Sequence, residues 1–259
     1  MSYPNLPDKH RFAAIVEPGA MLAHRRRGGR LTVERPISGV VICLQRGLPE
    51  RLRWRIRLQR LGRLMGDLYA VRRTAGRVAV LTNFGLGAPI VAAQAEELIA
   101  LGATRLVSVA LAGGIRPDLA PGAIVAPDVA IRDEGTSHHY LPPGREVASD
   151  PGLAAGLVAA LRSHGAEVHV GRSWSTDAPY RETREEVARY GGEGVLAVDM
   201  ELAALLAVAE TRGVAAAGVL VVGDSLAGGL WRPPERLDAM ERSLEAAYRA
   251  AIEVLDGRG

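Results

Sequence analysis

Short apolar runs alternate with longer helix-forming stretches along most of the chain. Apolar runs bounded by turn residues predict buried strands, and they cover residues 40–44, 78–82, 106–111, 123–131, 167–171 and 216–222. Helices are predicted over 90–101, 153–163, 182–190, 201–212 and 235–255, with residues 195–200 leading into the fourth. This alternation predicts an α/β fold: a single domain with a central, mostly parallel twisted sheet flanked by helices in three layers.

Two segments fit the alternation less well. Residues 1–37 are rich in Pro, Arg and Gly and predict an N-terminal arm, either solvated or wrapped around a neighbouring subunit, ahead of a domain over 38–259. Residues 51–71 space their apolar side chains as a helix does, but they also contain six arginines. They predict one helix, or a helix and a strand.

The composition is that of a globular protein, with 259 residues of which 48% are hydrophobic and 24% charged. The single cysteine, Cys43, excludes an intramolecular disulfide framework and a multi-cysteine zinc site, and its apolar neighbours predict a buried thiol. The net charge of +3 is small, so it does not favour a nucleic-acid partner. No apolar run reaches the roughly 18 residues of a membrane span, and residues 1–12 hold no signal-peptide core. We therefore expect a cytoplasmic protein with no membrane partner.

Candidate chemistry follows the strands, because ligands of open α/β sheets bind at the carboxyl ends of the strands. The turn Gly85-Leu86-Gly87-Ala88-Pro89 offers backbone N–H groups to an anion or a sugar hydroxyl, or it is a tight turn without a ligand. It does not match the dinucleotide fingerprint, since Ile90 stands where the third glycine belongs and the next strand ends without an acid.

Acidic residues stand at two further strand ends. Asp199 and Glu201 flank Met200, a side chain that can lie against a flat ring; the alternative is that the two acids cap the following helix. Asp224 follows a long apolar strand, where a carboxyl group can donate a proton or serve as a turn residue. The adjacent histidines, His138 and His139, have no third metal ligand at suitable spacing.

Taken in order, these motifs resemble the nucleoside phosphorylase family, which contains purine nucleoside phosphorylases, uridine phosphorylases and methylthioadenosine nucleosidases. The resemblance runs from about residue 40 to 255. The motifs are Gly47-Leu48-Pro49-Glu50-Arg51, Gly85-Leu86-Gly87-Ala88-Pro89, Ala112-Gly113-Gly114-Ile115, Gly135-Thr136-Ser137-His138-His139-Tyr140, Thr176-Asp177-Ala178-Pro179-Tyr180, Val198-Asp199-Met200-Glu201 and Gly223-Asp224. It implies the phosphorylase-type α/β/α domain.

The resemblance also implies roles for single residues. Glu201 matches the glutamate that holds the ribose hydroxyls, and Met200 the methionine packed against the sugar. Asp224 matches the aspartate that protonates the leaving purine at N7. Gly47 and Arg51 match a glycine and an arginine of the phosphate site, and an arginine there would pair with phosphate bidentately. The substrate-binding set that the resemblance implies is completed by Ala112, Gly113 and Tyr180.

Several positions depart from the family pattern. Ser108 and Leu111 stand where phosphorylases carry a second phosphate arginine and a Ser or Thr. Hydrolytic members also lack that arginine, and Glu50 is the nearest candidate for their catalytic glutamate. Phosphorolysis and hydrolysis therefore both stay open.

The base pocket departs as well. Pro179 replaces the usual aromatic residue and leaves Tyr180 as the nearest ring, while Thr183 and Glu185 replace the uracil-reading residues. Asp224 favours a purine, whereas the loop containing His138 and His139 is more similar to the uridine branch.

The function expected from the resemblance is cleavage of the N-glycosidic bond of a nucleoside, by phosphorolysis of a purine nucleoside or of uridine to the free base and ribose 1-phosphate. The alternatives are a nucleosidase that uses water and a non-catalytic nucleoside-binding paralogue. The resemblance implies no metal and no organic cofactor, with phosphate as a co-substrate. It also implies a homo-oligomer, in which His10 is a candidate to complete a neighbour's ribose site.

Overall fold

The computed structural model describes residues 4–6, 8–29, 31–33, 36–45, 47, 56–235 and 237–257. The strands in this part of the chain are β1 (Gly39–Cys43), β2 (Leu58–Arg63), β3 (Asp67–Val71), β4 (Val78–Thr82), β5 (Arg105–Gly114), β6 (Ile124–Asp133), β7 (Glu146–Ala148), β8 (Val168–Thr176), β9 (Val195–Asp199) and β10 (Ala215–Ser225). The α-helices are α1 (Pro18–Arg27), α3 (Ala88–Ala100), α4 (Pro151–Ser163), α5 (Arg184–Gly192), α6 (Leu202–Arg212) and α7 (Asp238–Asp256).

The strands form one mixed sheet, in the order β2-β3-β4-β1-β5-β9-β8-β6-β10, with β7 added beside β6. Strands β4, β1, β5 and β10 run parallel to one another, as do β6, β8 and β9. Antiparallel pairings join β5 to β9 and β6 to β10. Because β10 also pairs with β5, the strands β5, β9, β8, β6 and β10 close into a ring. The carboxyl ends of β5, β9 and β10 meet in this ring.

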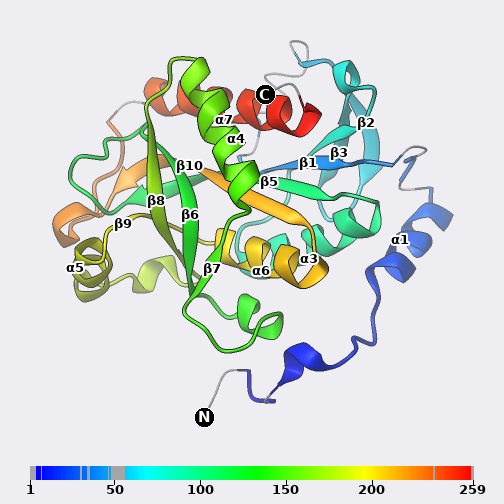
Figure 1. Ribbon diagram of the computed structural model, residues 1–259, viewed down its shortest axis with the longest axis horizontal. Helices are drawn as coiled ribbons and strands as arrows, with labels where there is room; N and C mark the ends of the chain where they lie inside the picture. The colour runs from blue at the N-terminus through cyan, green and yellow to red at the C-terminus, as the bar shows by residue number, and fades with distance from the viewer. Residues whose placement is uncertain are drawn as a thin grey trace.

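Helices cover both faces of the sheet, which confirms the predicted α/β architecture (Figure 1). One apolar cluster packs α3 and α6 on one face, and a second packs α4 and α7 on the other. Strands β1, β4 and β9 are buried at every position, as continuous apolar runs between two helical layers should be. No helix among the described residues has both the length and the apolar character needed to cross a membrane.

Residues 58–71 form a hairpin of β2 and β3, so the prediction of one helix over 51–71 is wrong, while the alternative with a strand is right for this stretch; residues 51–55 lie outside the described residues. The leucines at helical spacing fall in two strands, Leu61 in β2 and Leu68 in β3, and β3 pairs with both β2 and β4. Gly62 sits at a bulge in β2 with φ of 140°, a conformation incompatible with a helix. Tertiary pairing has overridden the local pattern.

Part of the N-terminal segment packs against the rest of the chain as helix α1. Leu22 is 4% exposed in the apolar cluster that contains α3. Arg25 donates from Nη2 to Glu97 Oε1 at 2.9 Å and from Nη1 to the carbonyl of Leu64 at 3.2 Å. Helix α1 therefore covers one side of α3, and Pro18 at its first turn suits a helix start.

Candidate active site

A cavity of about 1190 Å³ opens where β5, β9 and β10 end. Its walls come from the end of β1, the turn before α3, the three strand ends, and the segments after β8 and β10. The lining residues are Leu44, Gln45, Leu86, Ala110, Leu111, Ala112, Gly113, Pro179, Tyr180, Glu182, Val198, Asp199, Met200, Glu201, Gly223, Asp224, Leu226, Trp231, Pro234 and Met240. This is the edge of the sheet at which the sequence predicts a ligand.

Glu201 is held in the cavity wall by two backbone donors. Its Oε1 accepts from the N–H of Gly87 at 2.7 Å, and its Oε2 accepts from the N–H of Met200 at 3.2 Å. The residue is 4% exposed. A carboxylate has about four acceptor positions, so those that the backbone leaves free can accept from hydroxyl groups of a ligand in the cavity.

Asp199 anchors the start of α6 beside Glu201. Its Oδ2 accepts from the N–H of Leu202 at 2.8 Å, and its Oδ1 accepts from the hydroxyl of Ser175 at 2.5 Å. Burial raises the pKa of Asp199. Burial, with the charge of Asp199 as the next cause, also raises the pKa of Glu201. Asp199 thus accepts from the backbone at the start of α6, whose N-cap position is Glu201, and the Glu201 carboxyl group is the one left to accept from a ligand.

Asp224 reaches the cavity from a bulge in β10. Val222 pairs with Ala112 and Asp224 pairs with Gly113, so Gly223 is the extra residue between them. A β-carbon at Gly113 would lie 3.3 Å from Asp224 Oδ1 and 3.0 Å from a methyl group of Leu226. The absence of a side chain at position 113 therefore leaves room for the Asp224 carboxyl group.

The second oxygen of Asp224 has a side-chain donor. Trp231 donates from its indole Nε1 to Asp224 Oδ2 at 2.6 Å, although the Trp231 side chain is 66% exposed. Both residues line the cavity.

A second carboxyl group shares the cavity with Asp224. Glu182 precedes the capping box of α5, in which Thr183 and Glu186 bond reciprocally. Burial, followed by the charges of Asp224 and Glu186, raises the pKa of Glu182 to about 7. Near neutral pH, Glu182 is therefore partly protonated beside the ligand space.

The wall at the β1 and β5 ends is mostly apolar among the described residues, with Gln45 as a polar exception. Leu44, Leu111 and Met240 line it. Ser108, by contrast, is 2% exposed in the middle of the sheet, and its hydroxyl has no hydrogen-bond partner in the described part of the chain. Ser108 therefore does not contribute to the cavity wall.

The predicted phosphate residues lie next to this wall only in part. Gly47 is two residues after Gln45 and has φ of 78°, which suits glycine in a turn. Arg51 lies outside the described residues. The charged residues in the described wall are the carboxylates Glu182, Asp199, Glu201 and Asp224.

The remaining predicted substrate residues reach the same cavity. Met200, Ala112 and Gly113 line it with Glu201 and Asp224. Tyr180 also lines it, but its side chain is fully exposed in a short 3₁₀ helix (Pro179–Arg181). The structure thus brings together the predicted residues Asp224, Glu201, Met200, Tyr180, Ala112 and Gly113.

The loop that contains His138 and His139 is held by hydrogen bonds within itself and to neighbouring segments. Arg132 donates to Ser137 Oγ at 3.0 Å, and the N–H of Gly135 donates to Asp177 Oδ2 at 2.7 Å. His138 Nε2 lies 3.2 Å from the carbonyl of Arg132, and His139 Nδ1 lies 2.9 Å from Lys9 Nζ. These contacts hold the loop against β6, β8 and the N-terminal segment. Within the described residues, no three His, Cys, Asp or Glu side chains gather as metal ligands.

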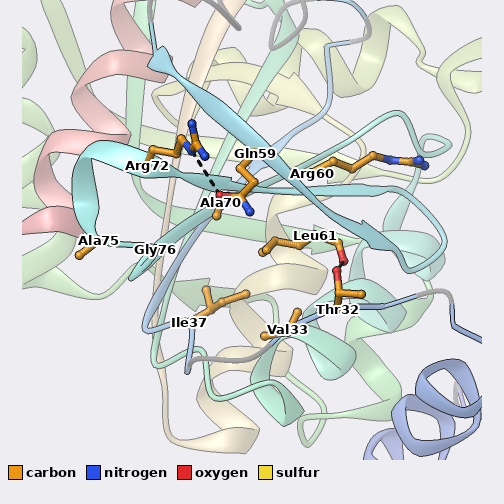
Figure 2. A pocket seen from close by; sticks show the side chains of 10 residues that line it. All are labelled: Thr32, Val33, Ile37, Gln59, Arg60, Leu61, Ala70, Arg72, Ala75 and Gly76. Atoms are coloured by element: carbon orange, nitrogen blue, oxygen red, sulfur yellow. Dashed lines mark hydrogen bonds between the residues drawn. The ribbon is translucent and has the colours of Figure 1, made fainter.

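A second cavity, of about 470 Å³, lies beside the β2–β3 hairpin. In Figure 2 the Arg60 side chain points away from Ile37, and Arg72 turns back to Gln59, to which its Nε donates at 3.3 Å. The hydroxyl of Thr32 donates to the carbonyl of Leu61 at 2.9 Å. The polar side chains of this second cavity thus bond to neighbouring residues or point away from it. The four carboxyl groups Glu182, Asp199, Glu201 and Asp224 line the larger cavity.

Comparison with known proteins decides the family. The model of the phosphorylase superfamily matches residues 41–256, which is most of the chain. The chain belongs to the phosphorylase superfamily. The N-terminal segment with α1 lies ahead of the matched residues.

Members of the phosphorylase superfamily that are named for different activities resemble the chain to similar degrees. A guanosine phosphorylase of Halorubrum lacusprofundi is 27% identical over 179 residues, 69% of this chain and 74% of the relative. A purine nucleoside phosphorylase of Bacillus cytotoxicus is 30% identical over 182 residues, 69% of this chain and 77% of the relative. A uridine phosphorylase of Salmonella typhimurium is 28% identical over 163 residues, 56% of this chain, and the match spans 64% of the relative's length.

A solved structure shows the same fold as this phosphorylase-superfamily chain. The AMP nucleosidase of Bacteroides thetaiotaomicron superposes with a TM-score of 0.70 at 18% identity, covering 92% of this chain and 96% of the other. The superfamily fold thus carries both phosphorylases and a nucleosidase.

Glu182 and Trp231 also line the cavity of this superfamily member, and the sequence motifs do not predict them. Glu182 stands at the predicted start of a helix, and its position two residues after the Thr176–Tyr180 motif is the signal for it. Trp231 lies in a Gly-Gly-Leu-Trp-Arg-Pro-Pro stretch seven residues after Asp224, in a chain with only 4% aromatic residues. A tryptophan in such a turn, close to a predicted acid, was a usable signal.

Proposed function

We propose that the protein cleaves the N-glycosidic bond of a purine nucleoside, with phosphate as the acceptor. The observation that carries the proposal is the placement of Glu201 and Asp224 in one cavity, where each carboxyl group accepts a hydrogen bond of 2.6–2.7 Å. In the proposed roles, Glu201 binds the sugar hydroxyls and Asp224 is the acid that protonates the base. The similarity to a guanosine phosphorylase and to a purine nucleoside phosphorylase supports a purine substrate.

In the proposed reaction, the bond between ribose C1′ and purine N9 breaks and its electron pair stays on the base. Asp224 gives its proton to N7 and becomes a carboxylate, so the purine leaves neutral. Positive charge develops on the ribose, and the Glu201 carboxylate, which binds the ribose hydroxyls, stabilises it. A phosphate oxygen then bonds to C1′, and the products are free base and ribose 1-phosphate.

A second acidic group lies in the cavity near Asp224. Glu182 lines the same cavity, and its pKa is raised to about 7 by burial, with the charge of Asp224 as the next cause. A protonated carboxyl group is thus available in the cavity near neutral pH.

The acceptor is proposed as phosphate, bound by Gly47 and Arg51 with the arginines around them in the sequence. Gln45 of the cavity wall is followed along the chain by Arg46, Arg51 and Arg53. Guanidinium groups bind phosphate bidentately. The proposal includes no metal and no organic cofactor.

A second candidate is hydrolysis, and a specific observation favours it. Leu111 lines the cavity where phosphate donors are expected, and the charged side chains of the described wall are all carboxylates. Such a wall repels a phosphate dianion but accepts water. The two candidates share Glu201 and Asp224 and differ only in the group that attacks C1′.

Product analysis separates them. Purified protein is incubated with inosine or guanosine in a phosphate-free buffer, with and without added phosphate. Phosphorolysis predicts base release only with phosphate, together with ribose 1-phosphate. Equal release without phosphate, with free ribose as the product, would replace the first candidate by the second.

A homo-oligomer is proposed as well. Large apolar side chains are exposed along the N-terminal segment, at Leu6, Phe12, Ile15 and Val16. They provide area for a contact with a second copy, near His10 of the same segment. Light scattering after size exclusion tests this proposal, and a monomer at micromolar concentration would contradict it.

A further inference from the structure

The segment after β10 folds back over the cavity and is anchored at several points. Ser225 and Arg232 form an antiparallel bridge, with N–H to carbonyl bonds of 3.0 and 2.8 Å. Arg232 also donates from Nη1 to the carbonyl of Ala227 at 3.2 Å. These bonds close a short loop whose residues Leu226 and Trp231 line the cavity, and Pro234, just after the loop, lines it as well. The loop is therefore a wall of the site with a fixed shape.

The turn of this loop rests on the start of α5. Arg184 donates from Nε to the carbonyl of Gly229 at 3.2 Å. Gly229 has φ of 70°, and a β-carbon there would lie 2.8 Å from Arg184 Cγ. The close approach requires glycine and leaves little space for the turn to move. Trp231, two residues later, is held at a set distance from the strand that carries Asp224.

Trp231 contributes two different groups to the cavity, its indole N–H and its aromatic ring. Its indole N–H donates to Asp224 Oδ2 at 2.6 Å, and tryptophan can only donate at this atom. Its side chain is nevertheless 66% exposed although it lines the cavity. The nitrogen is thus occupied by the acid, while much of the ring remains uncovered.

The bond distinguishes the two oxygens of Asp224. Oδ2 accepts from Trp231, whereas Oδ1 lies beside Gly113, where a β-carbon would come within 3.3 Å of it. A proton on Oδ1 is therefore the one that a base in the cavity can receive. A hydrogen bond to the carboxylate also stabilises the charge that remains on Asp224 after the transfer.

We propose that Trp231 is a positioning residue for Asp224 and the aromatic platform for the base. Its N–H fixes the carboxyl group so that Oδ1 faces the purine, and its ring stacks on the purine. This assignment rests on the proposed function. It supplies the ring that the sequence lacks beside Pro179, since Tyr180 is fully exposed. The stacked ligand is a planar heteroaromatic base, which aromatic side chains bind through their faces.

Two substitutions separate the two roles. Trp231→Phe keeps a ring but removes the N–H, whereas Trp231→Ala removes both. Leu230→Ala is the matched control, because Leu230 is exposed on the same loop and does not line the cavity. Thermal unfolding of each variant confirms that it is folded before the comparison.

Binding of hypoxanthine, a free purine base, tests the platform without turnover. Equilibrium dialysis should give Trp231→Phe an affinity within about threefold of the original protein, and Trp231→Ala about tenfold weaker binding. Hypoxanthine should also quench the indole emission of the original protein and of Leu230→Ala, but not that of Trp231→Phe. Unchanged affinity in Trp231→Ala would overturn the platform role.

Turnover of the purine nucleoside tests the positioning role. Trp231→Phe should lower kcat about 10- to 100-fold with little change in KM, because a bond to a charged group is lost while the ring remains. A kcat within twofold of the original would overturn this role. If no nucleoside is cleaved by the original protein, the proposed function and the positioning role both fail, while the dialysis result still decides whether Trp231 binds a base.

Discussion

The backbone N–H of Gly87 donates to Glu201 Oε1 across 2.7 Å, joining residues 114 positions apart in the sequence. Gly87 has φ of 101° and stands at the N-cap of α3. The glycine turn therefore binds an anion, as its sequence suggests, but that anion belongs to the protein. The bond places the Glu201 carboxylate at the cavity wall instead of leaving the N–H for phosphate.

Replacing Glu201 by glutamine is expected to abolish most of the activity. The amide nitrogen of Gln cannot accept from Gly87, Met200 or a ribose hydroxyl, and the developing charge on the sugar loses its counter-charge. We expect kcat/KM for the purine nucleoside to fall at least about 100-fold. Glu185→Gln, on the exposed surface of α5, is the control and should leave the rate unchanged. A fall of less than fivefold in Glu201→Gln would remove the sugar-binding role.

Gly113→Ala is expected to disturb the acid without touching it chemically. The added methyl group would lie 3.0 Å from Leu226, 3.1 Å from Val198 and 3.3 Å from Asp224 Oδ1. The Asp224 carboxyl group must shift, so we expect kcat to fall roughly tenfold or more. Gly192→Ala is a matched control, because a β-carbon there meets no atom within 4 Å. Equal rates for the two variants would show that the space above Gly113 is not used.

Leu111→Thr tests where the acceptor binds. If phosphate occupies the cavity beside β5, the new hydroxyl donates to it and the KM for phosphate should fall about tenfold. Leu111→Ala opens the same space without a donor and serves as the control. Phosphate dependence that is identical in the two variants would place the acceptor elsewhere.

Glu182 predicts a specific dependence of stability on pH. Burial, then the charge of Asp224, raises the pKa of Glu182 from 4.5 to about 7. The folded state therefore binds a proton more tightly than the unfolded state does, so stability falls as the pH rises from about 4.5 to about 7.

Replacing the Glu182 carboxyl group by an amide removes this loss of stability at higher pH. The melting temperature of Glu182→Gln minus that of the original protein should therefore be larger at pH 8 than at pH 5, by roughly 2 °C or more. Glu185→Gln should show no such change. The same difference at both pH values would contradict the protonated state of Glu182.

The predicted strands match the structure best where the runs are wholly apolar. β4 (Val78–Thr82) has the predicted bounds, whereas β8 runs to Thr176, five residues past the predicted end. The reason is chemical: Ser173 and Ser175 interrupt the apolar run, yet both are fully buried, and Ser175 donates to Asp199. A polar residue that serves a neighbouring strand cannot be distinguished from a loop residue by pattern alone.

The residues of the candidate site also differ in how strongly the sequence indicates them. Glu201 and Asp224 could be found because they follow apolar strands directly, and both line the cavity. For Trp231 and Glu182 the sequence offers only a weak signal, their proximity to Asp224 and to the Thr176–Tyr180 motif, because their place depends on how a loop folds back and how α5 begins. Short-range pattern contains neither the Ser225–Arg232 bridge nor the contact of Arg184 with Gly229.

Base release by the original protein and by Asp224→Asn tests the central claim most directly. Inosine, guanosine, adenosine and uridine are each incubated with and without phosphate, and the free base and the sugar product are measured. The account predicts purine release with phosphate, ribose 1-phosphate as the product, and a rate at least about 100-fold lower in Asp224→Asn, about 2.7 kcal/mol of transition-state stabilisation. An undiminished rate in Asp224→Asn would contradict the role of Asp224. No release from any nucleoside would contradict the account as a whole and favour a non-catalytic nucleoside-binding protein.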